Sequence, residues 1–152
     1  MTYNDILRRI RYTFDCSDDE MIELFAHADV SVTREQISNW LKKDDDADYK
    51  SMGDEELASF LNGLIINNRG KREGVQPPVE TKLTNNIIFR KLKIALDFKD
   101  DDILSLLETV DFRLSRHELS AFFRKPTHKH YRECKDQILR NFLNALQNQH
   151  RA

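Results

Sequence analysis

The feature that most constrains the fold of this chain is an internal repeat. Residues 2–64 align with residues 84–146 without a gap, and about 19 of the 63 aligned positions are identical. The similarity is clearest between SNWLKKDDDADYKSMGDEELASFLNGL and SAFFRKPTHKHYRECKDQILRNFLNAL, which begin at Ser38 and Ser120. Self-similarity over this length is typical of a duplicated structural unit. We therefore predict two units of one fold, formed by residues 1–68 and 84–152.

The segment between the two copies has the composition of a linker. It contains RGKREGVQPPVETK, in which Gly70, Gly74, Pro77 and Pro78 interrupt any helical pattern. Glycine and proline together favour an extended connection. We therefore predict a linker over residues 69–83.

Each copy has the pattern of four helices. Apolar residues recur at helical spacing, and the third helix of each copy opens with a capping box, Thr33-x-x-Gln36 or Ser115-x-x-Glu118. No segment alternates with the period of two that is typical of a strand. The prediction is an all-α fold of two tandem four-helix repeats. The expected core residues are Ile6, Leu24, Trp40, Phe60 and Leu61 in the first repeat, and Ile88, Leu106, Phe122, Phe142 and Leu143 in the second.

Composition and motifs exclude several classes of function. No apolar stretch approaches the roughly 20 residues that a membrane-spanning helix needs, so we expect no membrane partner. Two widely separated cysteines suit a reducing compartment, which predicts a cytoplasmic protein. The sequence contains no phosphate-binding glycine loop, nucleophile elbow or HExxH motif. We therefore expect no catalytic residues, no cofactor and no enzymatic activity.

The loop of the first repeat invites a calcium interpretation. Four acidic residues stand at positions 1, 3, 5 and 12 of an EF-hand-like loop: Asp44, Asp46, Asp48 and Glu55. However, Tyr49 stands where such a loop needs glycine, and the equivalent loop of the second repeat lacks the carboxylates. A solvated acidic loop is the better interpretation.

The loop of the second repeat invites a zinc interpretation instead. His128, His130 and Cys134 are close enough in sequence to act as ligands. Cys134, however, aligns with Met52, so its position accepts a large apolar side chain. That pattern favours a buried structural cysteine over a metal ligand.

A nucleic-acid interface is the alternative function. Residues 18–43 and 100–125 each follow the order of a helix-turn-helix pair. In the second repeat, this unit and the following loop carry groups that suit phosphates and guanine edges: Arg116, His117, Ser120, Arg124, Lys125, Lys129 and Arg132. Against this interpretation, the turns lack the usual glycine and carry Asp29 and Asp111 near that point.

The two repeats carry opposite net charge. Residues 1–68 hold 7 Lys+Arg against 15 Asp+Glu, a net charge of −8, whereas residues 84–146 hold 12 against 9, a net charge of +3. Nucleic acid would be repelled by the first repeat. We therefore predict a non-enzymatic protein-interaction or regulatory module that binds another protein or a second copy of itself. We also hypothesise that the basic surface around Arg124, Lys125, Lys129 and Arg132 complements the acidic Asp44–Asp48 region, within one chain or across a dimer.

The passages FLNGLIINNRGKREG and SAFFRKPTHKHYRECKDQILRNFL resemble the YehS-like family of short bacterial proteins. The likeness covers nearly the whole chain. It implies a duplicated helical unit and a bacterial cytoplasmic protein of unknown function. It supplies no catalytic residues.

Overall fold

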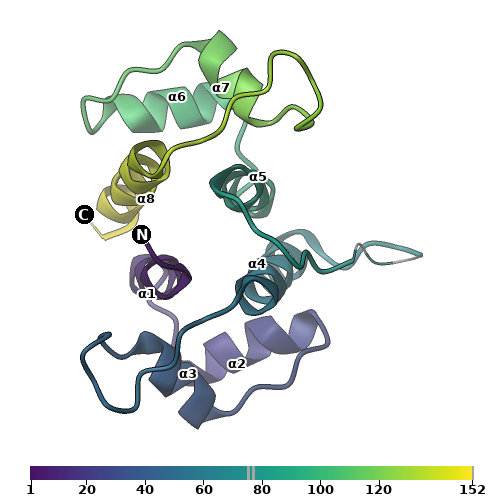
Figure 1. The fold of residues 1–152 in the computed structure, drawn as a ribbon, viewed down its shortest axis with the longest axis vertical. Coiled ribbons are helices and arrows are strands. Elements are labelled where there is room, and N and C mark those ends of the chain that lie inside the picture. The colour runs from purple at the N-terminus through teal and green to yellow at the C-terminus, as the bar shows by residue number, and fades with distance from the viewer. Residues whose placement is uncertain (75, 77, 152) are drawn as a thin grey trace. The chain divides into compact units, whose positions relative to one another are not determined.

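The computed structural model describes residues 1–74, 76 and 78–151, and it has an all-α architecture (Figure 1). No strand occurs among these residues, and the helices form two consecutive sets of four. The first set is α1 (Tyr3–Thr13), α2 (Asp18–His27), α3 (Arg34–Leu41) and α4 (Asp54–Arg69). The second set is α5 (Asn85–Ala95), α6 (Asp100–Glu108), α7 (Arg116–Phe122) and α8 (Asp136–Arg151). The predicted fold of two tandem four-helix repeats is confirmed.

The chain divides into two compact units, one ending at Leu83 and the other beginning at Thr84. The described residues of the predicted linker group with the first unit, and Val75 and Pro77 lie outside the described residues. The contacts of Leu83 explain part of this grouping. Its N–H donates to Asp54 Oδ2 at 3.0 Å, its carbonyl accepts the Tyr3 hydroxyl at 3.2 Å, and its side chain is buried.

The carboxylates at helix starts serve as caps. Full capping boxes begin α1, α2, α3 and α7, where a hydroxyl and an acidic or amide side chain exchange hydrogen bonds with the backbone. At α4 and α6 only the reciprocal half is made: Glu56 accepts the Gly53 N–H and Asp102 accepts the Lys99 N–H, each at 2.7 Å. These acidic side chains accept hydrogen bonds from backbone N–H groups at the helix start, and their negative charge interacts favourably with the positive end of the helix dipole.

Four aspartates adopt the left-handed backbone conformation. Asp15 and Asp97 follow the first helix of their repeats, and Asp29 and Asp111 follow the second helix, with φ between 51° and 61°. Aspartate tolerates this region better than most residues with a side chain. Asp29 and Asp111 therefore occupy positions at which glycine would otherwise be expected.

Each unit has its own core. All ten predicted core residues are buried. In the first unit, Phe25 stacks on Trp40 with ring centroids 5.5 Å apart and packs against Phe60 at 5.4 Å. In the second, Phe89 packs against Phe142 at 4.8 Å. Aromatic pairs at these distances add to the free energy gained by burying the rings.

The repeats differ where the second helix meets the fourth. A Cβ atom added to Gly63 of α4 would lie 1.7 Å from the Leu24 carbonyl oxygen of α2, so the two backbones are in direct contact there. The equivalent residue of the second repeat is Ala145, which is buried. There the structure contains a hollow of about 510 Å³ between α6 and α8, lined in part by Phe98, Leu106 and Ala145.

Candidate protein-interaction surface

The loop between α3 and α4 is held by a buried asparagine of α1. The Asn4 amide nitrogen donates to the carbonyls of Trp40 and Lys50 at 2.9 and 2.8 Å, and its oxygen accepts the Met52 N–H at 2.9 Å. Asn4 is only 1% exposed. One side chain thus satisfies three backbone groups, and two of these hydrogen bonds are buried, where polar groups need a partner.

Asn86 of α5 does the same in the second repeat. It donates to the carbonyls of Phe122 and Arg132 at 3.0 and 2.7 Å and accepts the Cys134 N–H at 2.9 Å. All three partners are equivalent to those of Asn4. The two asparagines are identical in the alignment of the copies, but this role was not predicted from the sequence. A polar residue identical in both copies and lying among the apolar positions of a helix was the available signal.

The two loops also share their inner turn. In residues 42–50, which we call the acidic loop, Asp46 Oδ1 accepts the Asp48 N–H at 2.9 Å. In residues 124–132, the basic loop, His128 Nδ1 accepts the His130 N–H at 3.0 Å. A carboxylate and an imidazole thus make the same local hydrogen bond. The loops therefore keep one backbone design while their exposed side chains differ in charge.

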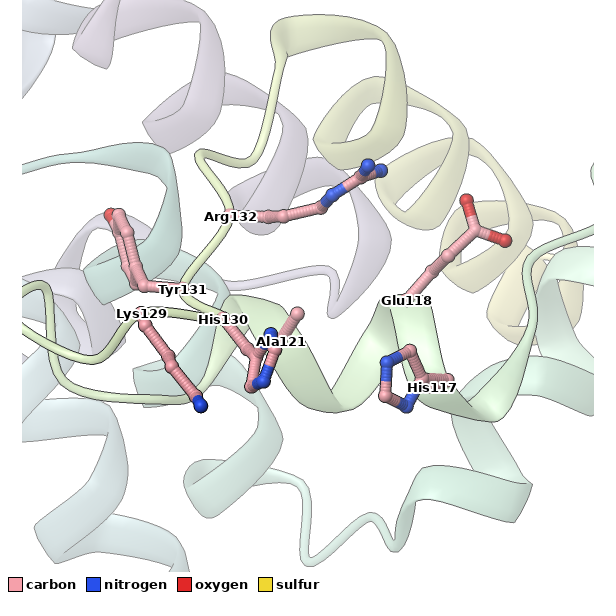
Figure 2. Close-up of a pocket in the computed structure, with 7 residues that line it drawn as sticks. All are labelled: His117, Glu118, Ala121, Lys129, His130, Tyr131 and Arg132. Atoms are coloured by element: carbon pink, nitrogen blue, oxygen red, sulfur yellow. The ribbon is translucent and has the colours of Figure 1, made fainter.

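Seven residues line a hollow of about 530 Å³ between α7 and the basic loop (Figure 2). We call this cavity the basic hollow, and the residues that line it are His117, Glu118, Ala121, Lys129, His130, Tyr131 and Arg132. Figure 2 shows the side chains of His117, His130 and Lys129 reaching to one side of α7, while those of Glu118 and Arg132 extend to the other. The hollow combines four basic side chains, two of them imidazoles, with one carboxylate.

An alanine replaces an amide side chain beside the basic loop. Ala121 is equivalent to Asn39 of the first repeat, whose side-chain oxygen accepts the Lys42 ammonium at 3.1 Å. Alanine cannot make this hydrogen bond and has a much smaller side chain. The space beside the loop is therefore less filled in the second repeat at this position.

The single carboxylate of the hollow is already engaged. Glu118 accepts the Ser115 N–H at 3.2 Å as part of the cap of α7. This backbone hydrogen bond is the main cause that lowers the pKa of Glu118, and the positive charges of Arg132 and His117 act in the same direction. Glu118 remains ionised and structural, so the rest of the hollow presents positive charge.

The other predicted surface residues are dispersed. Arg116 forms an ion pair with Asp101 at the start of α6, as Arg34 does with Asp19 in the first repeat. Arg124 is half-buried, and its Nη1 has no hydrogen-bond partner among the described residues. Ser120 is half-buried, and Lys125 is exposed. Of the seven predicted residues, the structure brings only His117, Lys129 and Arg132 together around the hollow.

Neither proposed ligand cluster assembles into a metal site. Within the described part of the chain, no three His, Cys, Asp or Glu side chains are grouped so that they could hold an ion. Asp48 lies 3.7 Å from the Lys42 ammonium, and Glu55 lies in the first turn of α4. Burial raises the pKa of the Cys134 thiol to about 12, which disfavours the thiolate that zinc requires.

The helix-turn-helix interpretation is not confirmed. Residues 28–33 connect α2 to α3 and residues 109–115 connect α6 to α7, which is longer than the turn of about three to four residues in that motif. The helix that would read the groove, α7, has seven residues, and its first residue is paired with Asp101. This pairing reduces the positive charge that Arg116 offers to phosphate.

Across the residues that the structure describes, no helix combines the length and apolar character required to cross a membrane.

The geometry defines a class: duplicated four-helix repeats, each with an asparagine-held loop. Two segments, residues 3–70 and 85–152, match the family described as Protein of unknown function (DUF1456), and the chain belongs to this family. It is 44% identical over 149 residues to the Uncharacterized protein YehS of Escherichia coli (strain K12), covering 96% of this chain and 94% of that protein. No solved structure matches. The family resemblance inferred from the sequence is confirmed.

Proposed function

We propose that this protein is a non-enzymatic interaction module whose basic hollow binds an acidic segment of a protein. One observation carries the proposal: the same asparagine-held loop presents carboxylates in one repeat and cationic side chains in the other. The partner is a different protein or a second copy of this chain. Free cysteines at Cys16 and Cys134 suit a reducing compartment, so we expect the module to act in the cytoplasm.

In each loop, different groups hold the backbone in place and provide most of the surface charge, and this separation supports the proposal. The hydrogen bonds that fix each loop come from Asn4 or Asn86, from the backbone, and from Asp46 or His128. The remaining exposed side chains are not needed for these bonds. Their charge can therefore serve recognition, because complementary charge steers partners and disfavours wrong ones.

An acidic protein suits the chain better than nucleic acid does. The first repeat, with its net charge of −8, would repel phosphates, and Arg116 is already paired with Asp101. A short acidic segment has to reach only the hollow of the second repeat. At moderate salt, repulsion from charges more than about 10 Å away is largely screened.

Fluorescence anisotropy tests the proposal with two labelled probes, a hexaglutamate peptide and a mixed-sequence DNA duplex. We expect the peptide to bind at 50 mM salt, to bind at least fivefold more weakly at 300 mM, and to bind at least fivefold more weakly to Lys129→Glu. The control Arg140→Glu changes net charge equally on the exposed part of α8 and should have a smaller effect. Equal loss in both variants, or preference for DNA, would contradict the proposal.

A further inference from the structure

We infer that the acidic loop of a second copy of this chain is the segment that occupies the basic hollow. The inference rests on the proposed function, because it names the partner of the same site. It predicts self-association through unlike repeats: the first repeat of one copy contacts the second repeat of another.

The acidic loop has the chemistry that the hollow accepts. Asp44, Asp45, Asp46 and Asp48 lie within five residues, and all four are exposed. The Asp46 carboxylate already accepts a hydrogen bond within its turn, and the Asp48 carboxylate lies near the Lys42 ammonium. Asp44 and Asp45 are therefore the carboxylates best suited to bind a partner. Adjacent exposed carboxylates of this kind repel each other, and a cationic partner relieves that repulsion.

The basic hollow offers complementary donors. Lys129 and His130 are exposed on the basic loop, and His117 is exposed on α7. An ammonium supplies three N–H donors and an imidazole at least one, which matches the acceptor-only character of a carboxylate. The buried Ala121, in place of Asn39, leaves space for an incoming aspartate side chain beside these donors.

The charge pattern selects contacts between unlike repeats. Positions 35, 46 and 48 of the first repeat are Glu, Asp and Asp, whereas the equivalent positions 117, 128 and 130 of the second are all His. A contact between two first repeats would therefore join like charges. A two-fold arrangement would make the favourable contact twice and close a dimer, whereas any other rotation would build rings or chains.

A charge-swap experiment tests the inference. One variant carries Asp44→Lys and Asp45→Lys, and the other carries Lys125→Glu and Lys129→Glu. All four residues are exposed, and the hydrogen bonds that hold the loops come from other groups. Sedimentation velocity is measured at 50 and 500 mM salt over roughly a hundredfold range of concentration, with circular dichroism as a check of folding.

The expected result is association of the wild type at low salt that is lost at high salt. Each variant alone should remain at the 18.0 kDa monomer, because its loop and hollow then carry like charge. An equimolar mixture of the two variants should associate again, since every contact joins opposite charges. Restored association in the mixture would show that the two altered surfaces contact each other, which neither variant can show alone.

Two results would overturn the inference. A wild type that stays monomeric at every concentration would exclude a second copy as the partner, as would association that both variants retain. In either case, hexaglutamate binding that is weakened by Lys129→Glu would leave the proposed function intact. If the peptide also fails to bind, both proposals fail together.

Discussion

Substitution of Gly63 by alanine tests how closely α2 and α4 approach each other. In an unhindered helix interior this change would stabilise the helix by about 1 kcal/mol, because alanine is the better helix former. Here the new Cβ would lie 1.7 Å from the Leu24 carbonyl oxygen and 2.7 Å from its carbonyl carbon. Both clashing atoms belong to the backbone, so no change of rotamer relieves the contact and the helices must move apart.

The expected net effect is a loss of about 2 kcal/mol. Overpacking lowers the free energy of unfolding by about 1–3 kcal/mol, and a rigid backbone neighbour places this site at the upper end of that range. The higher helix propensity of alanine offsets about 1 kcal/mol of this loss. For a unit of 83 residues this corresponds to a fall in melting temperature of about 8–16 °C. The sign is therefore opposite to that expected from helix propensity alone.

Tryptophan fluorescence measures the loss of stability in the first repeat, which contains Gly63. Trp40 is the single tryptophan of the chain, is 5% exposed and stacks on Phe25 in the core of the first unit. The matched control is Ala145→Gly at the equivalent position of α8, which should lower the stability of the second repeat by about 1 kcal/mol and leave the tryptophan transition nearly unchanged. A tryptophan transition that stays in place or rises in Gly63→Ala would refute the close backbone contact.

Two further predictions concern the second repeat. Asn86→Ala should cost about 3 kcal/mol in urea unfolding followed by circular dichroism, because a buried carbonyl, a part-buried carbonyl and a buried N–H lose their partner. Loss of a single exposed side chain, as in Arg140→Ala, should change the midpoint little. The pKa of the Cys134 thiol is about 12 in the folded protein and near 9 in the unfolded chain. The resulting contribution to stability is fully present below pH 9 and is lost as the pH rises toward about 12. Stability should fall over that window and should fall less in Cys134→Met, which copies Met52; equal pH dependence in both proteins would contradict the assignment.

Local patterns predicted the architecture from the sequence. The gapless alignment of the copies, the helical spacing of apolar residues and the capping boxes all concern residues that are close in the chain or equivalent by duplication. Thr33 and Gln36, for example, exchange hydrogen bonds three residues apart, so their geometry follows from the helix start alone. The core residues were predictable for the same reason.

The candidate site was less predictable because it depends on contacts between distant segments. The carbonyls that accept from Asn86 lie 36 and 46 residues further along the chain. Arg116 was predicted as a group that suits phosphates and guanine edges, but Asp101 of the preceding helix pairs with it. The hollow depends on Ala121, whose small side chain is significant only beside the basic loop. Side-chain identity alone does not reveal such neighbours.

The opposite charges of the two loops can be understood from how each loop is held. If the acidic carboxylates had fixed the backbone, their replacement by His and Lys would have required a new loop. Instead, Asn4 and Asn86 satisfy the same three backbone groups from within the core, and the inner turn accepts either Asp46 or His128 as its acceptor. Surface charge is thereby uncoupled from folding, so one repeat can become acidic and its copy basic at little cost in stability. A duplicated scaffold of this design supplies two surfaces of matched backbone and opposite charge, which is the arrangement that self-recognition between unlike repeats requires.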